Sequence, residues 1–163
     1  MSAVFDVFTH ELDDALVVLE ASAGTGKTWS ITALVLRLVV ERGFPLDGIL
    51  LVTFTNKATD ELAERLRGRI RMAARFLASR AGAGAPVDAR ELDEDGFVAR
   101  YFTGRGDWLA QDHARVRAAA AALDQAAVST IHGFCARILA EHAVLCGLPP
   151  GLAISEDDAG VQQ

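Results

Sequence analysis

The chain has 163 residues, of which 51% are hydrophobic and 23% charged, with a net charge of −6. This composition is typical of one folded domain and excludes a disordered chain. The acidic balance also excludes a nucleic-acid binder that works through bulk positive charge, so any DNA contact must come from local groups.

Targeting signals are missing from the sequence as given. No apolar run is long enough to span a bilayer, and the first ten residues lack the pattern of a signal peptide. We therefore expect a cytoplasmic protein with no membrane contact.

The first predicted elements alternate between strand and helix. The apolar run at residues 15–22 ends at a glycine-rich turn and predicts a buried strand. Apolar residues recur at helical spacing over 31–39, and a glycine and a proline within 41–45 end this helix. Residues 48–55 are apolar without alternation, which is typical of a parallel strand covered on both faces.

The remaining elements continue this order. A helix beginning near Ala58 carries an apolar stripe. Residues 79–107 contain a glycine- and alanine-rich break and an acidic loop, and we interpret them as an insertion. A helix over 108–123, a strand over 126–131 and a helix ending near Gly147 follow. The alternation predicts an α/β fold with a parallel sheet.

Two groups of side chains have ordinary structural interpretations. Cys135 and Cys146 would lie about 16 Å apart on one helix, too far for a disulfide, so we expect buried free thiols. Arginines on the helix after Ala58 are interpreted as a solvated face: Arg65, Arg67, Arg69, Arg71 and Arg75.

A nucleotide site is indicated by residues 21–28, which read ASAGTGKT between the first strand and the first helix. Small residues let backbone N–H groups point at phosphates, Lys27 supplies a flexible cation, and Thr28 supplies a hydroxyl for Mg²⁺. The usual pattern, G-x-x-x-x-G-K-[ST], has glycine where Ala21 stands. An alanine with negative φ is acceptable at that position. The alternative is a glycine-rich turn that arose by chance.

Three segments together resemble one family. EASAGTGKT, LLVTFTNKATDELAERLRGRI and VSTIHGFCARIL stand in the order of motifs I, Ia and Ib of superfamily 1 DNA helicases of the UvrD/Rep group. Within that group the sequence is most similar to RecB-type subunits of exodeoxyribonuclease V, in which alanine replaces the same glycine. The resemblance implies a P-loop NTPase (RecA-like) parallel sheet with flanking helices. Residues 1–163 would be the N-terminal part of the first motor domain, so the sheet would be incomplete.

The resemblance also implies roles for single residues. The loop that would bind ATP phosphates comprises Ala21, Ser22, Ala23, Gly24, Thr25, Gly26, Lys27 and Thr28. Lys27 and Thr28 would serve catalysis, and Thr28 would bind Mg²⁺. The residues that would contact single-stranded DNA are Phe54, Thr55, Asn56, Lys57, Thr130 and His132. We expect these residues on one surface, at the carboxyl ends of their strands.

Residue patterns alone leave other interpretations of these positions open. Thr55 and Asn56 could simply cap the helix that follows them. His132 could be a core histidine. Phe54 could also be a core residue, which the sequence without the family favours.

The parent protein implied by the resemblance is an ATP-dependent DNA helicase and exonuclease of double-strand break repair and recombination. It would bind single strands and duplex ends beside RecC-like and RecD-like subunits. A second acidic motif is not convincing here: residues 91–95 follow no apolar strand, and Asp157 follows only a short, interrupted one. We therefore expect the chain alone not to be a competent helicase. The alternatives are a stand-alone P-loop kinase and a non-catalytic nucleotide-binding remnant.

Overall fold

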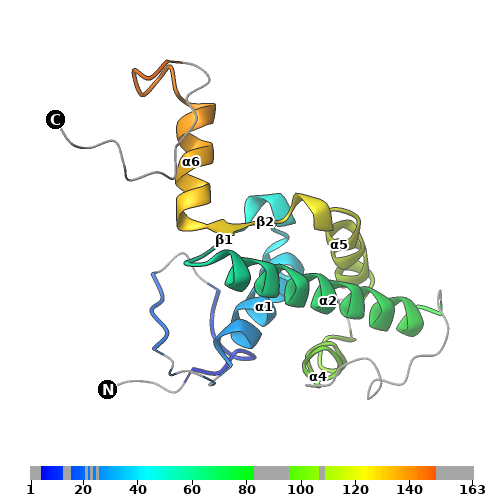
Figure 1. The fold of residues 1–163 in the computed structure, drawn as a ribbon. Coiled ribbons are helices and arrows are strands. Elements are labelled where there is room, and N and C mark those ends of the chain that lie inside the picture. Colours follow the sequence, from blue (N-terminus) through cyan, green and yellow to red (C-terminus); the bar gives the residue numbers. More distant parts are fainter. Residues whose placement is uncertain are drawn as a thin grey trace.

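The structure is a computed structural model that describes residues 5–12, 16–20, 22, 24, 26–82, 96–106 and 109–149. Helices dominate this part of the chain and surround one short sheet (Figure 1). In chain order the elements are α1 (Lys27–Arg37), the π-helix η1 (Leu38–Arg42), the 3-10 helix η2 (Leu46–Gly48), β1 (Leu50–Thr53), α2 (Asn56–Arg80), α4 (Phe97–Thr103), α5 (Leu109–Ala121), the 3-10 helix η4 (Leu123–Gln125), β2 (Ala127–Thr130) and α6 (Ile131–Glu141).

The sheet consists of β1 and β2, which pair in parallel from Leu50 beside Ala127 to Thr53 beside Thr130. Both strands were predicted, and both are shorter than the apolar runs that indicated them. The expectation that residues 48–55 are covered on both faces is wrong for the described residues, because Leu50 is 43% and Val52 46% exposed. Because a parallel pair needs a long crossover, α2, α4 and α5 all lie between the two strands in sequence.

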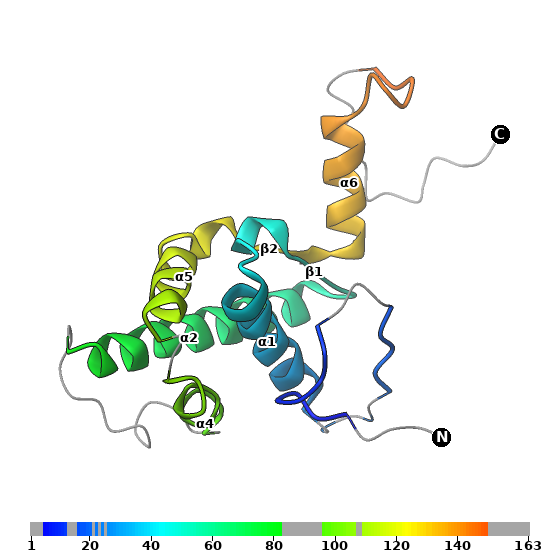
Figure 2. The same ribbon diagram turned by 180° about the vertical axis from the view of Figure 1, so that it is seen from behind.

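The core lies between the helices. The long helix α2 crosses the molecule, with α1, α4 and α5 packed against it (Figures 1 and 2). Leu66 and Ile70 of α2 are fully buried beside Leu36 of α1 and Val116 of α5. Each such side chain contributes about 1.5–3 kcal/mol on full burial, so this helical packing holds α1 and α2 in place.

The helix α4, within the segment interpreted as an insertion, also supplies core side chains. Phe97 and Phe102 of α4 are almost completely buried. Phe97 stacks on Tyr101 at 5.5 Å and meets Trp29 of α1 edge-on at 5.5 Å. Residues 83–95, including the acidic loop at 91–95, lie outside the described residues.

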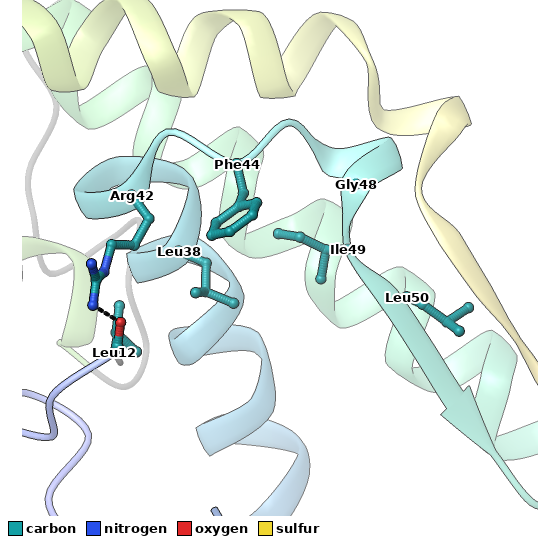
Figure 3. Close-up of a pocket in the computed structure, with 7 residues that line it drawn as sticks. All are labelled: Leu12, Leu38, Arg42, Phe44, Gly48, Ile49 and Leu50. Atoms are coloured by element: carbon teal, nitrogen blue, oxygen red, sulfur yellow. Dashed lines mark hydrogen bonds between the residues drawn. The ribbon is translucent and has the colours of Figure 1, made fainter. Parts of the chain in front are cut away.

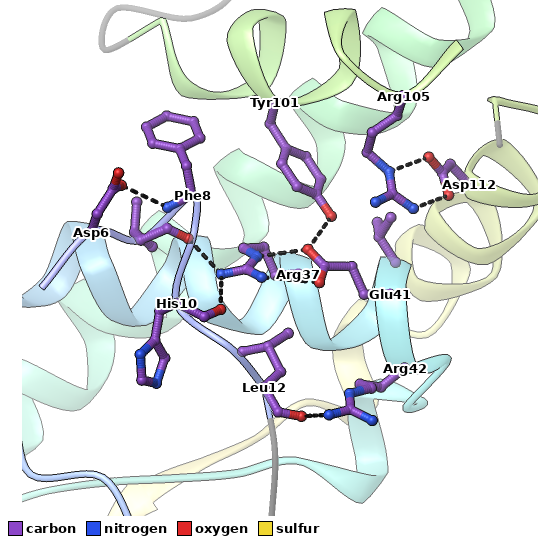
Figure 4. Close-up of polar contacts among 12 residues, drawn as sticks. Asp6, Phe8, His10, Leu12, Arg37, Glu41, Arg42, Tyr101, Arg105 and Asp112 are labelled. Carbon is purple, nitrogen blue, oxygen red and sulfur yellow. Dashed lines mark hydrogen bonds and ion pairs between the residues drawn. The ribbon is translucent and has the colours of Figure 1, made fainter. Parts of the chain in front are cut away.

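A cluster of polar groups fastens the N-terminal segment to α1 and η1 (Figure 4). Arg37 donates hydrogen bonds to the carbonyls of Val7 and His10, both at 2.7 Å, and to both carboxylate oxygens of Glu41, at 2.6 and 3.0 Å. The hydroxyl of Tyr101 donates to Glu41 at 2.8 Å. Burial would raise the pKa of Glu41, but the hydrogen bonds from Arg37 and Tyr101 outweigh burial and hold that pKa below its usual value.

The predicted first strand is not a strand in the described residues. Residues 16–20 have no regular structure and pair with neither β1 nor β2. Leu16 is 93% exposed and Val18 76% exposed, so the prediction of a buried strand is wrong for this segment. A strand needs a neighbouring strand to pair its backbone N–H and C=O groups. Among the described residues, no strand pairs with residues 16–20.

Two further expectations are corrected. The helix α6 ends at Glu141, before the expected Gly147, and it buries no residue; Figure 1 shows it projecting from the helical body. Cys135 and Cys146 are free, as expected, but exposed rather than buried. Cys135 lies on α6, which buries none of its residues, and Cys146 lies beyond the end of this helix.

The arginine face of α2 also differs from the expectation. Arg65, Arg67, Arg71 and Arg75 are exposed, as expected. Arg69 is only 9% exposed and lies between helices, so it does not belong to the solvated face.

Candidate nucleotide and nucleic-acid sites

The described part of the predicted phosphate loop leads directly into α1. Gly24 and Gly26 have φ of +78° and +86°, left-handed conformations that favour glycine. Lys27 and Thr28 are the first two residues of α1, whose first N–H groups have no partner within the helix. The N–H groups of a first helical turn and the helix dipole both favour an anion at this end of α1.

Lys27 lies over its own loop. Its Nζ donates a hydrogen bond of 2.8 Å to the carbonyl of Ser22, and the side chain is exposed. Both glycines and Lys27 thus fit a loop that closes around an anion. Ala21, Ala23 and Thr25, which complete the predicted site, lie outside the described residues.

The two predicted DNA segments emerge from the same edge of the sheet. The parallel register pairs Thr53 with Thr130, so the residues that follow both strands lie at neighbouring strand ends. Figure 1 shows α2 and α6 leaving this edge in different directions. The backbone register therefore confirms the expectation that the two segments lie together at the carboxyl ends of their strands.

Threonine side chains shape both turns. Thr55 Oγ1 accepts a hydrogen bond of 3.2 Å from the N–H of Ala58 at the start of α2. Thr130 Oγ1 accepts one of 3.0 Å from the N–H of Gly133 at the start of α6. A Cβ at Gly133 would lie 3.1 Å from Thr130 Oγ1, so this glycine leaves room for the cap. The capping interpretation is therefore correct for Thr55 and also applies to Thr130.

Two residues that sequence reasoning missed support the first turn. Thr53 Oγ1 and Thr59 Oγ1 lie 2.6 Å apart, and each donates to the carbonyl of Thr55 at 3.1 Å. The repeated threonines at positions 53, 55 and 59 were the available signal. Their hydroxyls fix the backbone from which Phe54 and Asn56 project.

The side chains at this edge are open to solvent. Phe54 is 86% exposed, and Asn56, Lys57 and His132 are also exposed. The core interpretations of Phe54 and His132 are therefore wrong. An exposed aromatic beside a cation and an amide is suited to stack on a base while the polar groups contact phosphate.

Two hollows on the described surface lie elsewhere. One, of about 500 Å³, is lined by Leu12, Leu38, Arg42, Phe44, Gly48, Ile49 and Leu50, at the end of β1 remote from Phe54 (Figure 3). The other, of about 350 Å³, is lined by Phe8, Arg37, Glu41, Arg100, Tyr101, Gly104 and Arg105, in the region of Figure 4. Neither contains a predicted site residue. No cluster of three metal-binding side chains occurs among the described residues.

Comparison with known proteins explains why the predicted phosphate loop and the two strand-end turns occur in one chain. Residues 7–163 match the family described as UvrD/REP helicase N-terminal domain. The chain belongs to this helicase family. The phosphate loop and both strand-end turns lie within the matched residues.

Relatives of this helicase domain include three bacterial proteins named RecBCD enzyme subunit RecB. The one from Escherichia coli (strain K12) is 37% identical over 150 residues, which are 87% of this chain and 12% of that protein. The one from Mycobacterium tuberculosis (strain ATCC 25618 / H37Rv) is 40% identical over 122 residues, 75% of this chain and 10% of that protein. The one from Haemophilus influenzae is 35% identical over 149 residues, 87% of this chain and 12% of that protein. The chain thus spans about a tenth of the length of these relatives.

The described architecture agrees with a helicase motor domain at a coarse level. It is α/β, with a two-stranded parallel sheet and flanking helices. None of the described helices has the length and apolar character needed to cross a membrane. The complete RecA-like sheet, and residues 79–107 as an insertion, remain predictions.

Proposed function

We propose that this chain is the ATP-binding portion of a RecB-like, ATP-dependent DNA helicase that acts in double-strand break repair and recombination. One observation carries the proposal: the family match spans residues 21–28, which have the sequence pattern of a phosphate loop, and two strand-end turns that leave one edge of a parallel sheet. Exonuclease activity, single-stranded DNA and duplex ends as substrates, RecC-like and RecD-like partners and a cytoplasmic location belong to the same proposal. The name of the relatives, RecBCD enzyme subunit RecB, supports the RecC-like and RecD-like partners. The other parts are supported by the resemblance to RecB-type subunits.

The nucleotide would bind at the start of α1. The N–H groups of Lys27 and Thr28 lie in the first turn of a helix of 11 residues, and Lys27 adds a positive charge. These groups fit the β- and γ-phosphates of ATP, with Ala21, Ser22, Ala23, Gly24, Thr25 and Gly26 wrapping them. The Thr28 hydroxyl would hold Mg²⁺, which would neutralise charge on the phosphates.

Single-stranded DNA would lie across the edge formed by the β1–α2 and β2–α6 turns. Phe54 would stack on a base, while Asn56 and Lys57 would contact phosphate oxygens. Thr130 and His132 would contact the strand from the second turn. The caps made by Thr55 and Thr130 fix the starts of α2 and α6 at this edge.

A binding experiment tests the DNA part of this proposal. The affinity of the chain for an oligo(dT) is measured at several salt concentrations, for wild type, Lys57→Ala and the control Arg75→Ala. Arg75 is an exposed cation farther along the same helix, so both variants lose one charge. Lys57→Ala is expected to weaken binding and to reduce the salt slope by about 0.7, the value for one phosphate contact.

The control variant shows whether the effect of Lys57→Ala depends on the position of the lost charge. Arg75→Ala should bind with nearly the wild-type slope. Equal losses in both variants would show that only overall charge matters and would contradict the proposed edge. A stand-alone kinase is not favoured, because the family match and the RecB relatives all indicate a helicase.

A further inference from the structure

Arg69 connects the helix of the nucleotide loop to the helix of the candidate DNA edge. It lies in α2, and its Nε donates a hydrogen bond of 3.1 Å to Thr32 Oγ1 in α1. The Thr32 hydroxyl in turn donates to the carbonyl of Trp29 at 3.0 Å. Trp29 follows directly after Lys27 and Thr28, so this polar chain ends in the first turn of α1.

Aromatic contacts reinforce the same connection. The Arg69 guanidinium lies 4.9 Å from the ring centre of Phe97 and 5.6 Å from that of Trp29. The two rings meet edge-on at 5.5 Å. Because Arg69 and Phe97 are buried, water screens these cation–π contacts little. Three helices, α1, α2 and α4, are therefore joined at one guanidinium.

This junction joins the two helices whose starts carry the candidate nucleotide and DNA sites. Arg69 lies 13 residues beyond Asn56, which corresponds to about 20 Å along a continuous helix. Because the buried guanidinium contacts both helices in a closely packed core, we expect a shift of the first turn of α1 to move α2 with it. A lysine at position 69 would retain the charge but lose the planar fork.

We propose that Arg69 is a positioning residue that couples nucleotide binding at the start of α1 to DNA binding at the start of α2. The inference rests on the proposed function. Coupling between two sites is reciprocal and commonly changes affinity by about 5- to 150-fold. Removal of Arg69 should abolish most of this change while leaving each ligand's own contacts in place.

The experiment uses the 163-residue chain in a Trp108→Phe background, because the sequence contains two tryptophans and Trp29 then becomes the only reporter. A non-hydrolysable ATP analogue with Mg²⁺ is titrated with and without saturating oligo(dT), and Trp29 emission and calorimetry give both affinities. The ratio of the two affinities is the coupling factor. The variants are Arg69→Met, Arg69→Lys and the control Arg71→Met, which removes an exposed cation from the same helix.

We expect a coupling factor of at least about 5 in wild type and Arg71→Met, close to 1 in Arg69→Met, and intermediate in Arg69→Lys. The affinity of Arg69→Met for each ligand alone should stay within about twofold of wild type, which a general loss of structure would not allow. If circular dichroism shows that Arg69→Met is unfolded, Thr32→Val decides by the same ratio, because it removes the hydroxyl that links Arg69 to the Trp29 carbonyl.

Three results would overturn the coupling role alone: a wild-type factor of 1 although both ligands bind, an unchanged factor in folded Arg69→Met, or an equal loss in Arg71→Met. Failure of the proposed function gives a different result, because wild type would then bind no nucleotide or no DNA.

Discussion

The ion pair between Arg37 and Glu41 offers a sharp test of how the N-terminal segment is held. Glu41→Gln keeps the size of the side chain but removes the charge opposite a buried guanidinium. The side chain of Arg37 is 6% exposed and that of Glu41 25% exposed. Breaking a fully buried pair costs about 3–5 kcal/mol, and partial exposure with the retained amide oxygen reduces this to about 2 kcal/mol.

The pH dependence follows from the lowered pKa of Glu41. A carboxyl group whose pKa is lower in the folded state stabilises the fold above its ordinary pKa of 4.5 and loses that contribution as pH falls through the folded-state value. Wild type should therefore be more stable than Glu41→Gln at about pH 7, and the difference should shrink below about pH 4.5. Urea unfolding followed by circular dichroism measures both values.

A matched control separates burial from charge. Glu61 pairs with Arg65 at 2.6 Å, also four residues along a helix, but both side chains are about half exposed. Glu61→Gln should therefore cost less than about 1 kcal/mol. A loss in Glu41→Gln no larger than in Glu61→Gln, or one that persists unchanged in acid, would refute the reasoning.

Three further substitutions have distinct expected effects. Phe97→Ala should lower the free energy of unfolding by about 3–5 kcal/mol, because the ring is buried between α1, α2 and α4; a loss below about 1 kcal/mol in urea unfolding would contradict that packing. Phe54→Ala should leave the unfolding midpoint unchanged, because the ring is exposed, and weaken oligo(dT) binding by about 1–3 kcal/mol; unchanged binding by fluorescence anisotropy would remove Phe54 from the site. Thr130→Ala should cost about 1 kcal/mol of stability through the lost cap, whereas Thr130→Ser should retain it; equal unfolding midpoints for the two variants would argue against the cap.

Local patterns predicted several of the elements that form. The apolar runs of β1 and β2 and the periodic stripe of α2 each appear in the structure, with ends shifted by a few residues. Residues 16–20 have the same apolar character as β1 but form no strand. Strand formation depends on a neighbouring chain segment, which a local pattern does not contain.

Arg69 shows how a residue type can mislead. Charged residues are rarely buried, which led to its assignment to the solvated face. Its position carried the opposite signal, because it continues the spacing of the buried residues Leu62, Leu66, Ala73 and Phe76. Residue patterns without the family favoured Phe54 as core for the converse reason: an aromatic residue after an apolar strand resembles core until the strand is seen to end at Thr53. The resemblance, in contrast, predicted Phe54 as a DNA contact, which requires an exposed ring.

The motif sequences, by contrast, predicted candidate sites that the fold alone would not have indicated. Neither of the two hollows described above lies at the start of α1 or at the edge around Phe54. The order of the three motifs placed both sites before any geometry was known. The structure then added the threonine caps and the contacts of Arg69, which depend on packing between distant segments.

Calorimetric titration of the chain with ATP and Mg²⁺ tests the central claim most directly, with Lys27→Ala and Lys57→Ala compared with wild type. Lys27 is the only cation among residues 21–28, so Lys27→Ala should weaken binding by about 1.5–3 kcal/mol, roughly 10- to 150-fold. Lys57→Ala, which removes the same charge at the DNA edge, should bind nucleotide as wild type does. Equal nucleotide affinity in wild type and Lys27→Ala would contradict the assignment of this chain as the ATP-binding part of a helicase.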